Sequence, residues 1–258
     1  MKNKRSTTHL RETGMRRLDR TMKRSLPSLF TLGNLLCGYL AIINVIEVAY
    51  VHAAWWIIIV VFFDYFDGKI ARMTGTASDF GIEFDSLADV VSFGIAPAVL
   101  FHQYILAGTG NFGYFLAFVF VCAGAFRLAR FNVTATTGKK AYFAGLPIPA
   151  GAGILASYVL FCEHIRGDFA QMDVAFALIT LTSAAMVSVF RYGTIPAIRF
   201  RNLRETIVSS TFVLLLASVI MYPDEIFFPL GIIYLLSGPV WSLTVPAYDF
   251  VSHRTHSR

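Results

Sequence analysis

The stretch DYFDGKIARMTGTASDFGIEFDSLAD, residues 64–89, lies between two runs so apolar that they require a bilayer as solvent, and four of its aspartates stand out by their spacing. Asp64 and Asp67 are spaced i, i+3. Asp85 and Asp89 are spaced i, i+4, so each pair lies on one face of a helix. A turn midway between the pairs would bring the two inner aspartates level with each other, and likewise the two outer ones. We therefore predict two membrane helices whose carboxylates converge.

Four converging carboxylates need positive charge. An ionised aspartate at membrane depth costs about 2.5–3.5 kcal/mol on insertion scales. The segment offers oxygen ligands without histidine or cysteine, a donor set that suits a hard divalent ion, Mg²⁺ or Mn²⁺, and two such ions if carboxylates bridge them. The alternative is an ion-pair network that joins two membrane helices.

Small and basic residues follow the first aspartate pair. Gly68 and Ala71 complete its helical stripe at positions where a core helix would carry Leu or Val, so a ligand can lie against that face. Arg72 ends the run, and Ser78 lies in the expected turn. This grouping suits the oxygens of a phosphate group.

The complete pattern is D-x2-D-G-x2-A-R-x8-G-x3-D-x3-D, from Asp64 to Asp89. It resembles, at every fixed position, the signature of the CDP-alcohol phosphatidyltransferase family. The resemblance implies an all-α integral membrane enzyme with a six-helix core. Such an enzyme moves a phosphatidyl group from CDP-diacylglycerol to an alcohol and releases CMP.

The resemblance also implies roles for individual residues. The metal ligands would be Asp64, Asp67, Asp85 and Asp89. Asp89 would also accept the proton of the acceptor alcohol and so be the catalytic residue. Contacts to CDP-diacylglycerol are expected from Gly68, Ala71, Arg72, Ser78 and Gly81.

The first apolar run contributes further candidates for donor binding. The family often has N-x-x-T at its start, and here Ser28 replaces the Asn while Thr31 remains. Asn34 is a polar residue inside the span. It is either a hydrogen-bonding link between helices or a contact to the nucleotide end of the donor.

Three segments resemble the serine-accepting subfamily: DSLADVVSFGIAPA (85–98), FRLARFN (126–132) and FAGLPIPA (143–150). They favour L-serine as the acceptor, with phosphatidylserine as the product. The same chemistry with glycerol 3-phosphate or inositol is the alternative.

Basic and polar residues in this region are candidates for the acceptor or the phosphate groups. Arg127 and Arg130 share a helical face that we expect to look into the same cavity as the aspartates. Asn132 and Lys139 are further candidates. The alternative for the two arginines is a purely topological role as membrane-flanking charges.

The chain has 258 residues, of which 56% are hydrophobic, and a mean hydropathy of +0.61, so one membrane domain is expected. Hydropathy predicts a polytopic bundle of about eight transmembrane helices, which the family resemblance divides into a six-helix core plus two. The predicted spans are 27–47, 52–73, 84–106, 112–131, 145–165, 172–190, 205–222 and 226–247. The predicted divisions are a basic arm (1–25), the family core (26–200), additional helices (201–250) and a tail (251–258).

The basic residues predict an orientation in the cell membrane. Of the 22 lysines and arginines, all but Arg166 fall on one side of this eight-span arrangement. The positive-inside rule therefore puts both termini and the aspartates on the cytoplasmic side. The basic arm would lie on anionic lipid headgroups rather than on nucleic acid. The expected partners are CDP-diacylglycerol, L-serine and membrane lipids, and a homodimer is one expected assembly.

Two other classes of protein also place aspartates in membrane helices. A membrane aromatic prenyltransferase would extend the first pair with another aspartate, where this chain has Ala71 and Arg72. A cation transporter would use the carboxylates as its binding site. Release of CMP from CDP-diacylglycerol would separate these classes from a phosphatidyltransferase.

Overall fold

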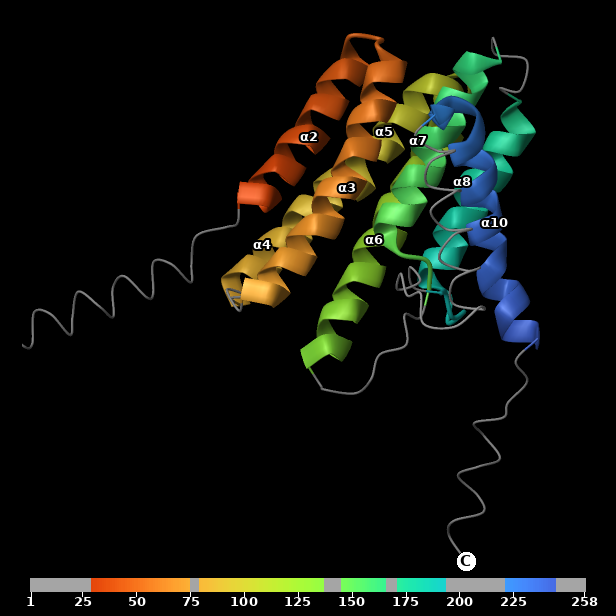
Figure 1. Ribbon diagram of the computed structural model, residues 1–258. Helices are drawn as coiled ribbons and strands as arrows, with labels where there is room; N and C mark the ends of the chain where they lie inside the picture. Colours follow the sequence, from red (N-terminus) through yellow and green to blue (C-terminus); the bar gives the residue numbers. More distant parts are fainter. Residues whose placement is uncertain (1–28, 75–78, 137–144, 166–170, 194–220, 245–258) are drawn as a thin grey trace, which may run out of the picture.

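The computed structural model is a bundle of long helices (Figure 1). It describes residues 29–74, 79–136, 145–165, 171–193 and 221–244, without the side chains of 62, 65–74, 79, 135–136 and 243–244. Predictions for the basic arm, the tail, most of the span 205–222, and the side chains of Ser28, Ser78 and Lys139 therefore lie outside the described residues.

The described elements are helical and follow one another along the chain. They are α2 (Leu29–Ile46), α3 (Tyr50–Thr74), α4 (Asp79–Asp89), η1 (Val90–Ile95), α5 (Ala96–Phe101), η2 (His102–Leu106), η3 (Ala107–Thr109), α6 (Asn111–Thr136), α7 (Ile148–His164), α8 (Met172–Val187) and α10 (Pro223–Thr244).

Helices α2 and α3 form an antiparallel pair joined by a tight turn. The Ala49 amide donates to the Asn44 carbonyl at 2.8 Å, and the Val48 amide donates to the Val45 carbonyl at 3.0 Å. These two bonds make a Schellman motif, which needs a left-handed residue after the helix. Val48 takes that conformation, with φ of 60°.

The third span is one continuous helical segment rather than a uniform α-helix. It starts as α4, changes to the π-helix η1 directly after Asp89, and contains a second π-segment, η2. The helical segment that is long and apolar enough to cross a membrane covers Phe80–Thr109, whereas the predicted span is 84–106. Polar residues near the beginning of this segment lower the local hydropathy, so the predicted span starts later than the helix. Backbone hydrogen bonding does not depend on hydropathy, and the helix therefore includes these polar residues.

Helix α7 is the core of the bundle. It contacts α3, α5, α8 and α10, and every residue from Gly151 to Leu160 is buried. Small side chains make this close packing possible. A Cβ at Gly151, for example, would collide with the end of the Met186 side chain.

The described part contains four helical segments long and apolar enough to cross a membrane. They are Leu29–Ile46, Phe80–Thr109, Asn111–Thr134 and Pro223–Ser242, with shorter apolar helices at Tyr50–Val61 and Met172–Val187. The protein is therefore an all-α integral membrane protein. The count of eight spans stays a prediction.

Candidate active site

Three aspartates, one from α3 and two from α4, lie close together. One carboxylate oxygen from each of Asp64, Asp85 and Asp89 lies within 4.8 Å of the other two. Asp89 is buried, with 7% of its surface exposed. The predicted convergence is confirmed for these three residues. Asp67 belongs to α3, and the position of its side chain lies outside the described residues.

Helix α2 supplies polar side chains to two of these aspartates. The Asn34 Nδ2 group donates to Asp89 Oδ1 at 2.9 Å, and Thr31 Oγ1 donates to Asp85 Oδ1 at 3.4 Å. Both residues are buried. The predicted site residues Thr31 and Asn34 therefore lie at the cluster, in contact with carboxylates. The Asn34 Oδ1 atom is buried without a hydrogen-bond partner among the described residues.

The backbone of α2 is fixed against η1 at the same place. Ser92 Oγ donates to the Asn34 carbonyl at 3.0 Å. A Cβ on Gly38 would lie 2.8 Å from the Ser92 Cα, so only glycine permits this approach. The π-segment that follows Asp89 thus holds Asn34 in register with that aspartate.

Arg127 of α6 brings positive charge to the cluster. It is buried, with 7% of its surface exposed, and its charge interacts with those of Asp89 and Asp64. Its guanidinium carbon lies 5.3 Å from the centre of the Phe131 ring. A buried arginine near the buried Asp89 carboxylate offsets part of the desolvation cost of that carboxylate.

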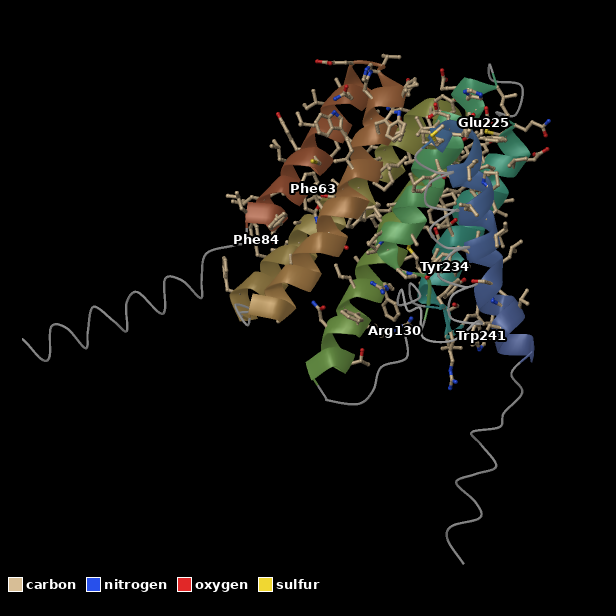
Figure 2. All side chains as sticks on the ribbon, viewed as in Figure 1. Phe63, Phe84, Arg130, Glu225, Tyr234 and Trp241 are labelled. Carbon is tan, nitrogen blue, oxygen red and sulfur yellow. The ribbon has the colours of Figure 1, made fainter. Side chains whose placement is uncertain are left out.

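Arg130 and Asn132, the other described candidates on α6, contact other parts of the protein. Arg130 donates to backbone carbonyls at the end of α8, and Figure 2 places its side chain at the lower end of the bundle. Asn132 Nδ2 donates to Ser86 Oγ at 2.8 Å, which ties α6 to α4 one turn before the last aspartate. Contacts of these two residues with substrate stay predictions.

The remaining candidates lie on the two helices of the aspartate motif. Gly68, Ala71 and Arg72 belong to α3, but their surroundings lie outside the described residues. Gly81 lies on α4, one turn before Asp85, and is half-buried. The contribution of Ser92 was not foreseen from the sequence, and its position three residues after Asp89 was the available signal.

The donor set of the cluster fits a hard divalent cation. It consists of carboxylate oxygens from α3 and α4, close enough for one ion to bind all three groups. Among the described side chains, the negative charges of the three carboxylates outnumber the single positive charge of Arg127, and Asp89 is buried. A bound cation would neutralise that excess.

Comparison with known proteins agrees with the signature. Residues 24–190 match the family described as CDP-alcohol phosphatidyltransferase. A CDP-diacylglycerol–serine O-phosphatidyltransferase of Helicobacter pylori is 35% identical over 82% of this chain and 88% of its own length. A protein of that name from Methanocaldococcus jannaschii is 38% identical over 64% and 72%, respectively. The archaetidylserine synthase of Methanothermobacter thermautotrophicus is 36% identical over 65% and 69%.

Proposed function

Because the chain belongs to the CDP-alcohol phosphatidyltransferase family, we propose that it transfers a phosphatidyl group from CDP-diacylglycerol to L-serine. The products are phosphatidylserine and CMP. The observation that carries this proposal is the convergence of Asp64, Asp85 and Asp89, with Asn34 hydrogen-bonded to the last of them. The names of the relatives in three organisms favour serine as the acceptor.

The metal proposed for this site is Mg²⁺ or Mn²⁺, as two ions, held by Asp64, Asp85 and Asp89 together with Asp67. When bound, such ions neutralise the diphosphate of the donor and stabilise charge on the attacking and leaving oxygens. The closeness of the Asp64, Asp85 and Asp89 carboxylates supports this proposal.

Asp89 is the proposed general base. In the net reaction, the serine hydroxyl oxygen forms a bond to the phosphorus that carries diacylglycerol, and its proton passes to the Asp89 carboxylate. The bond between that phosphorus and the bridging oxygen breaks, and CMP leaves with the electron pair. A carboxylate in hydrogen-bond reach of the hydroxyl can serve this role.

Asn34 orients the base. Its side-chain N–H donates to Asp89 Oδ1 at 2.9 Å, which leaves the second carboxylate oxygen for the acceptor or a metal. Because Ser92 holds the backbone of Asn34, the amide has little freedom to turn away. This contact restricts the carboxylate to one direction before substrate arrives.

Arg127 is the proposed partner of the serine carboxylate. It is a buried cation whose charge lies near those of Asp89 and Asp64, and a guanidinium pairs well with a carboxylate. Purified enzyme supplied with CDP-diacylglycerol and each acceptor in turn tests the assignment. Product from serine is expected, whereas product from glycerol 3-phosphate or inositol but none from serine would refute it.

The acyl chains of the donor are proposed to lie in an apolar groove beside the site. The groove has a volume of about 450 Å³ and is lined by Leu32, Leu35, Leu36, Tyr39, Ile42 and Val91. Leu35 and Val91 of its lining follow closely after Asn34 and Asp89 in the sequence, which supports a place for the acyl chains near the polar site. Leu36→Trp, which narrows the groove, should raise the KM for long-chain donors more than for short-chain donors.

The proposed orientation places the aspartates and both termini in the cytoplasm. It rests on the distribution of lysine and arginine between the two sides of the predicted bundle. Single cysteines at positions 76 and 136 should be labelled from the cytoplasmic side of sealed vesicles, and one at position 168 from the opposite side. Labelling of position 76 from outside would contradict the orientation.

A further inference from the structure

Two arginines one helical turn apart on α6 have different neighbours. Arg127 is buried and interacts with the charges of Asp89 and Asp64. Arg130 donates instead to the end of α8: Nη1 to the Val187 carbonyl at 3.1 Å, and Nη2 to the carbonyls of Ser188 at 3.0 Å and Met186 at 3.4 Å. Arg130 therefore bonds to α8, whereas the charge of Arg127 lies near those of the aspartates.

The three carbonyls belong to the last turn of α8, where a helix leaves acceptors without partners of its own. Cationic side chains are favourable there because they also meet the negative end of the helix dipole. In this protein the cation comes from another helix, 56–58 residues away in the chain. A planar guanidinium can serve several carbonyls at once, which an ammonium does less well.

The segment just before α7 also bonds to the end of α8, and we call this meeting point of α6, α7 and α8 the junction. The Gly145 amide donates to the Phe190 carbonyl at 2.8 Å, and the Leu146 amide donates to the Ala185 carbonyl at 2.9 Å. Gly145 has a positive φ of 86°. A Cβ there would collide with the Met186 carbonyl and lie 2.8 Å from Arg130 Nη2. The junction therefore requires glycine at this position.

We propose that Arg130 is a positioning residue: it fixes α6 to the ends of α8 and α7, and so holds Arg127 beside the aspartates. The inference rests on the proposed function, since the role of Arg127 is part of it. It gives a physical reason for the segments FRLARFN and FAGLPIPA to occur together, because they meet at α8. In this arrangement Arg130 acts through Arg127 rather than on substrate.

A double-mutant cycle tests whether Arg130 acts through Arg127. We expect Arg130→Gln to lower kcat/KM for serine by about tenfold and to add little in an Arg127→Gln background. Arg130→Lys should be as impaired as Arg130→Gln, because a lysine ammonium cannot replace the planar guanidinium whose N–H groups reach three carbonyls. Multiplicative effects of the two substitutions, or wild-type kinetics of Arg130→Lys, would overturn the proposal.

Gly145→Ala disturbs the same junction without removing a charge. It should reproduce the kcat and KM changes of Arg130→Gln and add little to them. Gly193→Ala is the matched control, because a Cβ at Gly193 meets nothing within 4 Å, and it should leave both parameters unchanged. Wild-type kcat and KM in Gly145→Ala would overturn the proposal, because this substitution disturbs the junction on which the proposal rests.

A structural readout separates this proposal from the reaction itself. Spin labels at the exposed positions Val133 on α6 and Val189 beyond α8, in a background with Cys122→Ser, report the distance between the two segments. We expect the distance distribution to broaden in Arg130→Gln and Gly145→Ala, and to stay narrow in Gly193→Ala. Narrow distance distributions in all three variants would refute the claim that Arg130 and Gly145 fix α6 to the end of α8, whether or not serine is the acceptor.

Discussion

The two ends of the helix bundle are held together by different kinds of contact, and α2 shows both. At the aspartate end, Asn34 donates across 55 residues to Asp89. Near the other end of the same helix, Asn44 donates to the Leu40 carbonyl four residues earlier, at 2.8 Å. The long-range polar contact fixes a carboxylate, whereas the local one satisfies only the helix itself. Along α2, therefore, the long-range side-chain bond lies at the aspartate end and the local one lies near the opposite end.

The opposite end, with the α2–α3 turn and the start of α10 (Figure 1), relies on backbone bonds and surface pairs. The Schellman motif closes α2. His164 Nε2 lies 3.1 Å from Glu225 Oε1, with both side chains about half exposed, near the end labelled in Figure 2. Such an exposed pair contributes about 0–1 kcal/mol at most. Changes there should alter stability slightly and catalysis hardly at all.

The largest effect is expected at Asp89. Asp89→Asn keeps the size of the side chain but removes the base, so turnover should fall by about 10³-fold, with CDP-diacylglycerol still bound. Kinetics with serine and a donor-binding assay measure the two quantities. Asp173→Asn, the same change at an exposed position on α8, is the control and should stay within about twofold of wild type. An Asp89→Asn variant with wild-type turnover would remove Asp89 from the role of base.

The second effect concerns the orientation of that base. Asn34→Ala removes a hydrogen bond to a charged group, worth about 1.5–3 kcal/mol, so kcat should fall by about 10–100-fold. Asn44→Ala, on the same helix, is the matched control and should leave kcat unchanged. If Asn34→Ala only raised the KM for CDP-diacylglycerol, Asn34 would be a donor contact and not an orienting residue.

A smaller effect is expected at Ser92, which acts one contact further from the reaction. Ser92→Ala keeps the Cβ that packs on Gly38 but removes the bond to the Asn34 carbonyl. Loss of a neutral hydrogen bond costs about 1 kcal/mol, and kcat should fall a few-fold. Ser157→Ala removes a buried hydroxyl whose bond is local, to the Ile154 carbonyl, and should affect kcat less. Equal effects of the two substitutions on kcat would contradict the proposal that Ser92 acts on Asp89 through Asn34.

The smallest effect is expected at the far turn. Val48 is a β-branched residue in the left-handed conformation, and 66% of its surface is exposed. Val48→Gly should therefore stabilise the fold by about 1 kcal/mol without changing kcat or KM. Thermal unfolding in detergent measures the gain. A lower melting temperature would contradict the predicted strain at Val48, and altered kinetics would show that the two ends are coupled.

The convergence of the aspartates could be predicted because it depends on local spacing and a single turn. Asp64 and Asp89 meet as two helical faces brought together, which requires no knowledge of distant segments. The contact between Asn34 and Asp89 is different. A polar residue in an apolar span indicates that it needs a partner, but the partner depends on how α2 packs against α4 and η1.

The π-segments and the two arginine roles were not predictable from local pattern. Hydrophobic periodicity identifies a helix but does not distinguish the wider π-turn after Asp89. The i, i+3 spacing of Arg127 and Arg130 predicts a shared face. It does not reveal that α8 ends beside the second arginine, because the end of α8 lies more than fifty residues further along the chain.

The central claim is a carboxylate-held metal site that transfers a phosphatidyl group to serine, and release of CMP tests it most directly. Purified protein with CDP-diacylglycerol and L-serine should release CMP and form phosphatidylserine in equal amounts. EDTA should abolish both products, and Mg²⁺ or Mn²⁺ should restore them. Full activity in a metal-free preparation, or no CMP with any acceptor in the presence of metal, would contradict the account.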